Sequence, residues 1–196
     1  MSRFRTVRER RLWIAAGIAV LLIYASAYFV QFLLLALRER GWLGPTILGL
    51  FLVVGSGALA WLVRQRPRWD EVALLVATAG VYVLLFRHLT IIQERIHLIQ
   101  YGGLAALFYA ALLERWPRPR PAEAPRWQRL QGLSAAALAA AAGWGDEVVQ
   151  GILPNRVYDL RDVELNALSG ALVVVVLAAR RWLRERAARV AALDSP

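Results

Sequence analysis

The stretch GWGDEVVQGILPNRVYDLRDVELNALSG, from Gly143 to Gly170, is the one place where acids, amides and an arginine recur between two apolar runs. Asp146 and Gln150 are four residues apart, and Glu147 and Gln150 are three residues apart. Side chains at these spacings lie on the same side of a helix. The pattern therefore predicts the end of a helix, with Gln150 beside both acids.

A turn is predicted next, at Pro154 and Asn155, because both residue types favour turns and proline interrupts a helix. A second helix is expected to follow, with Asp162, Asn166 and Gly170 one turn apart along one face. Two helix ends and the loop between them thus carry one polar cluster.

The composition of the chain is that of a membrane protein. Of its 196 residues 59% are apolar, and its mean hydropathy is +0.46, both too high for an ordinary soluble domain. The 24 basic residues are all arginines, give a net charge of +10 and lie at the ends of apolar runs. This placement is typical of anchoring to anionic lipid headgroups, so we expect no nucleic-acid partner. The lack of cysteine excludes disulfides and thiolate metal sites.

Six apolar runs are predicted to be spanning helices, because a helix needs about 20 apolar residues to cross the hydrocarbon core. The runs are Leu12–Leu37, Gly41–Val63, Val72–Phe86, Ile96–Leu113, Leu130–Gly145 and Val163–Leu183. The third, with 15 uncharged residues, is the shortest. The predicted fold class is all-α, a polytopic membrane bundle of about six transmembrane helices.

The two halves of the chain differ in polar content. Residues 1–90 are interpreted as an N-terminal three-span membrane segment, in which Tyr24 is expected to contact another helix. Residues 91–190 are interpreted as a three-span core that carries the polar cluster. Four prolines between positions 117 and 125 disfavour a helix and predict an extended connector between the fourth and fifth spans.

The distribution of arginine predicts the orientation. Six spans place both termini on one side, and that side carries 18 arginines against 6 on the other. Loops rich in arginine remain on the cytoplasmic side. We therefore predict cytoplasmic termini and a polar cluster that faces outward.

A second polar stretch begins the fourth run. Glu94, His97 and Tyr101 are spaced three and four residues apart, with Gln100 beside them, so one side of this helix start is polar. In the predicted topology these residues lie on the same side of the membrane as the Gly143–Gly170 stretch. Three spans are thus expected to contribute polar side chains at one depth.

One interpretation of the cluster is structural. In it, Asp146 or Glu147 pairs with Arg156, Asp162 caps the sixth helix, and Asn166 bonds to a neighbouring helix. The cluster then serves only to fix a loop.

The other interpretation is a functional site. The helix N-termini of the fourth and sixth spans favour anions, and with Arg156 and His97 they could hold a phosphate or a carboxylate. The candidate catalytic residues are Asp146, Glu147 and His97, of which the two acids could act as a general base or ligate a divalent cation. The sequence identifies neither a metal centre nor a cofactor. The candidate ligand-binding residues are Glu94, Tyr101, Gln150, Arg156, Asp159, Asp162 and Asn166.

Taken in order, these residues resemble a known family. The pattern is Glu94-Arg95-Ile96-His97 with Tyr101-Gly102, then Asp146-Glu147-x-x-Gln150, Pro154-x-Arg156, Asp159, Asp162, Asn166 and Gly170. It is similar to the VanZ-like family of bacterial membrane proteins, named for a member linked to teicoplanin resistance, over roughly Gln93 to Val176. Gln100 departs from the acid expected there in many relatives. The resemblance implies a multi-pass cell-envelope protein of the bacterial inner membrane. It also implies a link to lower glycopeptide susceptibility, a form of antibiotic resistance, but no particular reaction.

Three functions are consistent with these patterns. The first is an integral membrane protein whose outward cluster recognises an anionic or lipid-linked envelope component, with membrane lipids as partners. The second is a membrane-embedded hydrolase or transferase acting on a lipid phosphate, although no serine nucleophile has a recognisable setting. The third is a small transporter, which requires polar residues through the full depth of the spans, whereas spans two, five and six have few in their cytoplasmic halves.

Overall fold

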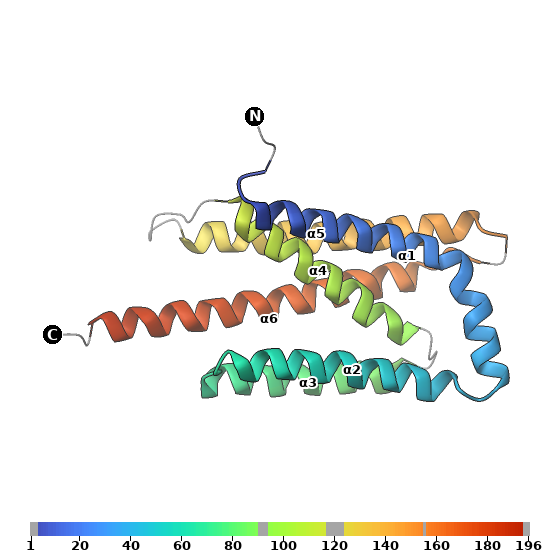
Figure 1. The fold of residues 1–196 in the computed structure, drawn as a ribbon, viewed down its shortest axis with the longest axis horizontal. Helices are drawn as coiled ribbons and strands as arrows, with labels where there is room; N and C mark the ends of the chain where they lie inside the picture. Colours follow the sequence, from blue (N-terminus) through green and yellow to red (C-terminus); the bar gives the residue numbers. More distant parts are fainter. Residues whose placement is uncertain (1–3, 90–93, 117–123, 155, 194–196) are drawn as a thin grey trace.

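The structure, a computed structural model, describes residues 4–89, 94–116, 124–154 and 156–193. Within these ranges the chain consists of six α-helices and the segments that join them, so the all-α prediction is confirmed (Figure 1). The helices are α1 (Val7–Glu39), α2 (Leu43–Arg64), α3 (Trp69–His88), α4 (Arg95–Arg115), α5 (Ala124–Ile152) and α6 (Leu160–Leu193).

The core lies between α1, α4, α5 and α6, and α4 is its central helix. The side chains of Leu98, Tyr101, Leu104, Ala105 and Ala111 on α4 are almost completely buried. They face three neighbouring helices, of which α6 and α1 make the most extensive packing with α4. Because α1 packs here, the core draws on both sides of the boundary proposed near residue 90. That division into two segments stays a prediction.

The hairpin of α2 and α3 lies outside this core, on the side of α4 and α6 away from α5 (Figure 1). Large apolar side chains on α1, α2 and α3 are exposed, for example Leu22, Val53 and Leu84. An exposed apolar surface of this extent is unfavourable in water and matches the hydrocarbon of a bilayer. Five helices, α1 to α4 and α6, are long and apolar enough to cross a membrane. The chain is therefore a multi-pass helical membrane protein by composition.

The helix α5 differs from the other five. It is 29 residues long but is not among the helices whose hydropathy suits a membrane span, so the fifth predicted span is confirmed only as a helix. Its middle is mostly alanine, which presents little apolar surface, and its buried face carries Gln131, Asp146 and Glu147. Protein covers that face, because α5 packs chiefly against α6 and α4. The number of crossings and their direction stay predictions.

Small residues bring α5 and α6 close together. A Cβ atom on Gly143 would lie 2.6 Å from the Cβ of Asn166, and one on Gly170 would lie 3.0 Å from the Cβ of Ala139. Larger side chains at these positions would push the helices apart. The close approach holds Asn166 of α6 directly against the backbone of α5.

Two helix boundaries differ from the predicted ones in an informative way. The helix α3 begins at Trp69 and is 20 residues long, longer than predicted, and its first turn includes Asp70 and Glu71. The prediction counted only uncharged residues and so excluded them. The helix α5 begins at Ala124, so Pro125 falls in its first turn instead of in an extended connector. A proline there breaks no helical hydrogen bond.

Other predicted features lie outside the described residues. They are Gln93 at the start of the resemblance, the connector prolines Pro117, Pro119 and Pro121, and Asn155 of the predicted turn.

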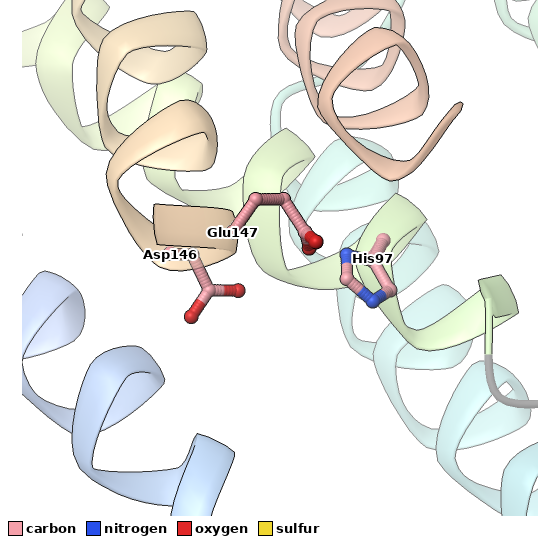
Figure 2. Close-up of side chains that lie close together, drawn as sticks. All are labelled: His97, Asp146 and Glu147. Carbon is pink, nitrogen blue, oxygen red and sulfur yellow. The ribbon is translucent and has the colours of Figure 1, made fainter. Parts of the chain in front are cut away.

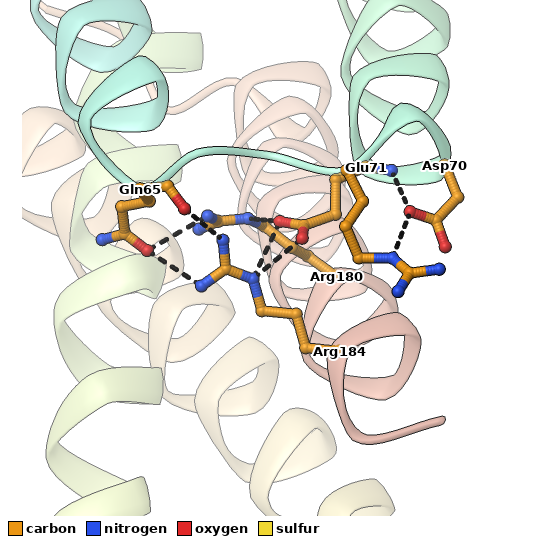
Figure 3. Close-up of polar contacts among 6 residues, drawn as sticks. Gln65, Asp70, Glu71, Arg180 and Arg184 are labelled. Atoms are coloured by element: carbon orange, nitrogen blue, oxygen red, sulfur yellow. Dashed lines mark hydrogen bonds and ion pairs between the residues drawn. The ribbon is translucent and has the colours of Figure 1, made fainter. Parts of the chain in front are cut away.

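At the end of the bundle where the chain termini lie, a buried acid is paired with arginines (Figure 3). Glu71 of α3 is 1% exposed and accepts hydrogen bonds from Arg180 Nε at 2.6 Å and from Arg184 Nε at 2.9 Å. The Oε1 atom of Gln65 accepts from both guanidinium groups. Arg180, expected to contact lipid headgroups, is instead 7% exposed and holds α6 to α3.

The same end holds a second buried acid of this kind. Glu9 of α1 is fully buried and pairs with Arg115 of α4 at 3.1 Å. It also accepts from the backbone N–H of Arg5 at 2.7 Å, while its own N–H donates to Thr6 Oγ1 and so caps α1. We call the Glu9 and Glu71 contacts the termini-end pairs.

Candidate functional site

The residues predicted to form a site come together at the other end of the bundle, where α5 ends and α4 and α6 begin (Figure 1). We call this group the loop-end cluster. Its members are His97 and Tyr101 of α4, Asp146, Glu147 and Gln150 of α5, Arg156 and Asp159 of the loop, and Asn166 of α6.

Two acids lie at the centre of the loop-end cluster and are held by neutral donors. Asp146 is 4% exposed, and Glu147 is fully buried. The Tyr101 hydroxyl donates to Asp146 Oδ2 at 2.9 Å. Gln150 Nε2 donates to Asp146 Oδ2 at 3.1 Å and to Glu147 Oε1 at 3.0 Å, the contacts that the helical spacing predicted. The backbone N–H of Asp159 donates to Glu147 Oε2 at 3.2 Å.

The negative charge of these acids is not balanced by any ion pair within the described residues. One oxygen, Asp146 Oδ1, is buried without a hydrogen-bond partner. Burial of a carboxylate that lacks a counter-charge is costly, because the solvation lost is not replaced. The arrangement therefore favours a bound proton or a bound cation.

His97 is oriented across the helix interface by an amide. Its Nδ1 lies 2.7 Å from Asn166 Oδ1, and Asn166 Nδ2 donates to the carbonyl of Gly143 at 3.4 Å. Because the amide nitrogen faces a carbonyl, the amide oxygen faces the ring, and Nδ1 is the donor. In the neutral imidazole Nε2 then carries the free lone pair. Asn166 thus bonds across to neighbouring helices, as the sequence suggested.

Three side chains of the cluster could share one bound ion. Figure 2 shows the Glu147 carboxylate extending toward the His97 ring, while Asp146 turns toward the side on which α1 lies. One ligand atom from each of these residues lies within 4.8 Å of the other two. A ring nitrogen beside two carboxylates is suited to proton exchange or to holding a cation.

A pocket of about 110 Å³ opens next to the acids. Its polar lining residues are Ser26, His97, Gln100, Asp146, Gln150 and Arg156. The lining from α1 is mostly apolar, with Ile23, Ala27, Val30 and Leu34 beside Ser26. The pocket therefore has a charged side and a hydrocarbon side.

Arg156 lines this pocket without an ionic partner. The turn that carries it forms as predicted, since its N–H donates to the carbonyl of Leu153 at 3.2 Å, across Pro154. The structural interpretation further required Arg156 to pair with Asp146 or Glu147. That pairing is wrong: Arg156 has no ion pair among the described residues, and its Nε is buried without a partner.

Three further predicted residues lie around the start of α6. Asp159, and not Asp162, caps this helix, because α6 begins at Leu160 and Asp159 Oδ1 accepts from the N–H of Arg161 at 2.8 Å. Asp162 instead lies in the first turn, where its charge is favourable to the helix. Glu94 approaches Arg161 at 3.8 Å. Burial, and then the Asp162 charge, raise the pKa of Glu94.

The contribution of α1 to the site was largely missed. Tyr24 donates from its hydroxyl to the carbonyl of Ala142 at 2.8 Å, which confirms that it contacts another helix. Its hydroxyl also touches the position where a Cβ on Gly145 would lie. The pocket wall around Ile23 and Ala27 left no trace in the sequence, because a uniformly apolar run does not indicate which face meets protein.

Comparisons with protein-family models, with curated proteins and with solved structures found no match. The functional argument therefore rests on the geometry of the loop-end cluster and on the pocket beside it.

Proposed function

We propose that this chain is a VanZ-like protein of the bacterial inner membrane whose loop-end cluster faces outward and binds an anionic or lipid-linked component of the cell envelope. The resemblance over the polar residues links such a protein to glycopeptide susceptibility. The observation that carries the proposal is the pocket, in which the unpaired Arg156 faces an apolar wall of α1.

The polar side of the pocket supplies the means to hold a phosphate or a carboxylate. A guanidinium group presents a planar fork of N–H donors that matches both anions. The Nε of Arg156 is already withdrawn from solvent and makes no other bond, so an anion that reaches it recovers a hydrogen bond that the free protein lacks. Asp146 and Gln150 nearby offer acceptors and donors to hydroxyl groups, which suits a headgroup that carries both an anion and a sugar or glycerol.

The apolar side of the pocket explains why a lipid-linked ligand fits better than a free anion. The residues Ile23, Ala27, Val30 and Leu34 follow one face of α1 away from the polar side chains. A hydrocarbon chain lying on this face would extend along the helix while its headgroup stays beside Arg156. A soluble anion would leave this wall unused.

A membrane-embedded hydrolase or transferase acting on a lipid phosphate is the second candidate. The observation that favours it is His97, which Asn166 holds with its Nε2 lone pair available near two carboxylates. Acid–base catalysis requires groups held in this way within reach of the reacting atoms. Release of phosphate from a bound polyprenyl phosphate would establish this function, and binding without turnover would leave the first.

The orientation is tested by reporter fusions. A reporter placed after Pro121 should show cytoplasmic activity, and one placed after Asn155 should show the external phenotype. The reverse pattern would place the loop-end cluster inside the cell and remove the envelope ligand from its reach.

Binding is tested with a matched pair of probes, a short polyprenyl phosphate and the polyprenol of the same length. The purified protein should bind the phosphate at least about 10-fold more tightly, because only the phosphate engages Arg156. Arg156→Ala should remove that preference and leave the weak binding of the alcohol. Arg161→Ala is the control, since Arg161 is 70% exposed and contacts Glu94 instead of the pocket. Equal loss in both variants would indicate a non-specific effect of positive charge and would contradict the proposal.

A double variant separates a ligand contact from a structural one. If Arg156 acts only by offsetting the nearby acids, then Arg156→Ala combined with Asp146→Asn should restore both folded yield and phosphate binding. If Arg156 holds the ligand, the double variant should recover yield and still fail to bind the polyprenyl phosphate.

A further inference from the structure

We propose that His97, Asp146 and Glu147 form a binding site for one divalent cation, through one ring nitrogen and two carboxylates. The proposal goes beyond the lipid pocket, because the cation would bind whether or not an envelope ligand occupies the space beside Arg156. Four observations carry it: the uncompensated charge, the orientation of each ligand, the free lone pairs, and an access path.

The charge of the cluster matches a divalent ion. When both are ionised, Asp146 and Glu147 carry two negative charges at 4% and 0% exposure, and no arginine of the described chain forms an ion pair with either. In the same molecule the buried Glu9 and Glu71 each have an arginine within 3.1 Å. Neutral donors orient a carboxylate but leave its charge in place. A cation of charge two bound between the acids would neutralise both.

Each of the three side chains is held in place by a group that would not itself touch the cation. Asn166 accepts from His97 Nδ1, which leaves Nε2 as the ligand atom. Tyr101 donates to Asp146, and Gln150 donates to both acids. This is the pattern of supporting hydrogen bonds that surrounds protein metal ligands. A cluster that existed only to fix a loop would have no need of a histidine held beside two acids with one ring nitrogen left free.

The carboxylates retain free lone pairs for a cation. Asp146 Oδ1 is buried and has no hydrogen-bond partner at all. Each oxygen of Glu147 accepts one hydrogen bond, from Gln150 or from the Asp159 N–H, and keeps a second lone pair. The pocket reaches two of the three side chains, because His97 and Asp146 line it, and Glu147 lies directly behind them.

The dimensions and chemistry of the site suit a small divalent cation such as Mn²⁺ or Zn²⁺. Adjacent ligands of one ion with bonds of about 2.1 Å lie about 3.0–3.4 Å apart, and only a pair on opposite sides lies about 4.2 Å apart. The three ligand atoms lie within 4.8 Å of one another, so the side chains must close by about 1–2 Å on binding. One imidazole with two carboxylates favours Mn²⁺ and Zn²⁺ over Ca²⁺, which prefers oxygen ligands alone.

The test uses the full chain, purified in detergent, treated with a chelator and transferred to metal-free buffer. Titration with Mn²⁺, followed by the loss of the free-ion signal in electron paramagnetic resonance, should show one bound ion per chain that excess Zn²⁺ displaces. Pulsed measurements on the bound Mn²⁺ should show coupling to a nitrogen nucleus, which identifies the histidine in the unaltered protein. No binding, or bound Mn²⁺ without nitrogen coupling, would overturn the proposal.

Variants provide the second arm of the experiment. His97→Gln and Glu147→Gln should weaken Mn²⁺ binding by about 10- to 100-fold or more, and Asn166→Ala by about 10-fold through loss of ring orientation. The matched controls are His88→Gln and Glu164→Gln, which alter the other histidine of the chain and an exposed acid of α6. Helix content by circular dichroism confirms that each variant is folded. Unchanged affinity in folded His97→Gln, or equal loss in the controls, would refute the site.

The lipid-binding proposal and the cation-site proposal can be refuted independently of each other. Mn²⁺ binding is measured without any lipid, and the phosphate preference is measured with Arg156→Ala, which leaves all three cation ligands in place. Loss of the phosphate preference alone would leave the cation site standing.

Discussion

The two ends of this bundle bury acids in opposite ways. At the termini end, Glu71 accepts from two arginines and Glu9 pairs with a third, so each carboxylate meets a full positive charge. At the loop end, Asp146 and Glu147 receive only neutral donors, while the nearby Arg156 makes no ion pair within the described chain. All four acidic side chains are less than about 5% exposed.

The difference matches that between a structural role at the termini end and the binding role that we propose for the loop end. A buried acid that holds two helices together is least costly when its partner is permanent, as in the contact of Glu71 on α3 with Arg180 on α6. A site that exchanges a ligand cannot fill its charges with permanent partners, because they would compete with the ligand. The loop end keeps two negative charges and one positive charge apart, and this separation is what a binding site requires. The comparison makes quantitative predictions for variants at each end.

The largest effect is expected for Glu71→Gln. The change leaves Arg180, which is 7% exposed, without a counter-charge, and breaking a buried pair in this way costs about 3–5 kcal/mol of folding free energy. Unfolding in a graded series of mixed detergents would measure the loss. The neighbouring Asp70→Asn is the control, since Asp70 pairs with Arg68 at the surface, where ion pairs contribute about 0–1 kcal/mol. A loss below about 1 kcal/mol for Glu71→Gln would mean that the termini-end pairs are not structural.

A smaller loss is expected for Gly143→Ala, which tests how the loop end is positioned. The new Cβ would lie 2.6 Å from the Cβ of Asn166, so α5 and α6 must separate, at a cost of about 1–3 kcal/mol. Because Asn166 orients His97, the cation affinity should fall together with stability. Gly103→Ala on α4 is the control: nothing lies within 4 Å of its Cβ, and alanine favours a helix over glycine. Normal cation affinity in Gly143→Ala would show that the Asn166 contact does not position the ring.

The contacts at the two ends of the bundle differ in how far the sequence could predict them. The contact of Gln150 with both acids follows from helical spacing alone, because all three residues lie within one turn of one helix. The pairing of Glu71 with Arg180 joins residues 109 positions apart and depends on which helices become neighbours. No local pattern carries that information. The sequence therefore located the loop-end cluster and missed the termini-end pairs.

The errors at the loop end have a related cause. The sequence predicts the turn at Pro154, but a turn fixes the backbone and not the direction of a long side chain, and Arg156 lines the pocket without an ion pair to either acid in the described chain. Residue type predicts Asp162 as the cap of α6, whereas the helix starts three residues earlier than that cap implies and Asp159 takes the role. The pocket itself needs α1, whose apolar face looks the same whether it meets lipid or protein.

The effect of Asp146→Asn on stability should be small and opposite in sign to that of Glu71→Gln. The asparagine oxygen can still accept from Tyr101 and Gln150, and the change removes a buried charge that has no ion pair. We expect stability in chelator-treated detergent solution to stay equal or to rise by up to about 1 kcal/mol, as is common when a functional group is removed from a site. The same variant should lose cation binding. A loss of stability as large as that of Glu71→Gln would make both ends structural and would remove the contrast between them.

The smallest effect on stability is expected for Glu94→Gln, and its size depends on pH. Glu94 lies at the margin of the loop end, where Arg161 is 3.8 Å away and 70% exposed, too far and too solvated to offset burial. Burial and the Asp162 charge raise the pKa of Glu94 above its ordinary value of 4.5, so the folded protein disfavours the charged form. The stability of the unaltered chain that depends on Glu94 is therefore present below about pH 4.5 and is lost as the pH rises through the raised pKa. Glutamine does not titrate, so the variant should be as stable as the unaltered chain at pH 4 and more stable at pH 7.5, by less than about 1 kcal/mol.

Unfolding of both proteins in detergent at the two pH values measures this difference in stability. If the variant is less stable than the unaltered chain at pH 7.5, the contact with Arg161 stabilises Glu94 more than burial destabilises it. Glu94 would then be a structural ion-paired acid like Glu9 and Glu71, although it lies at the other end of the bundle.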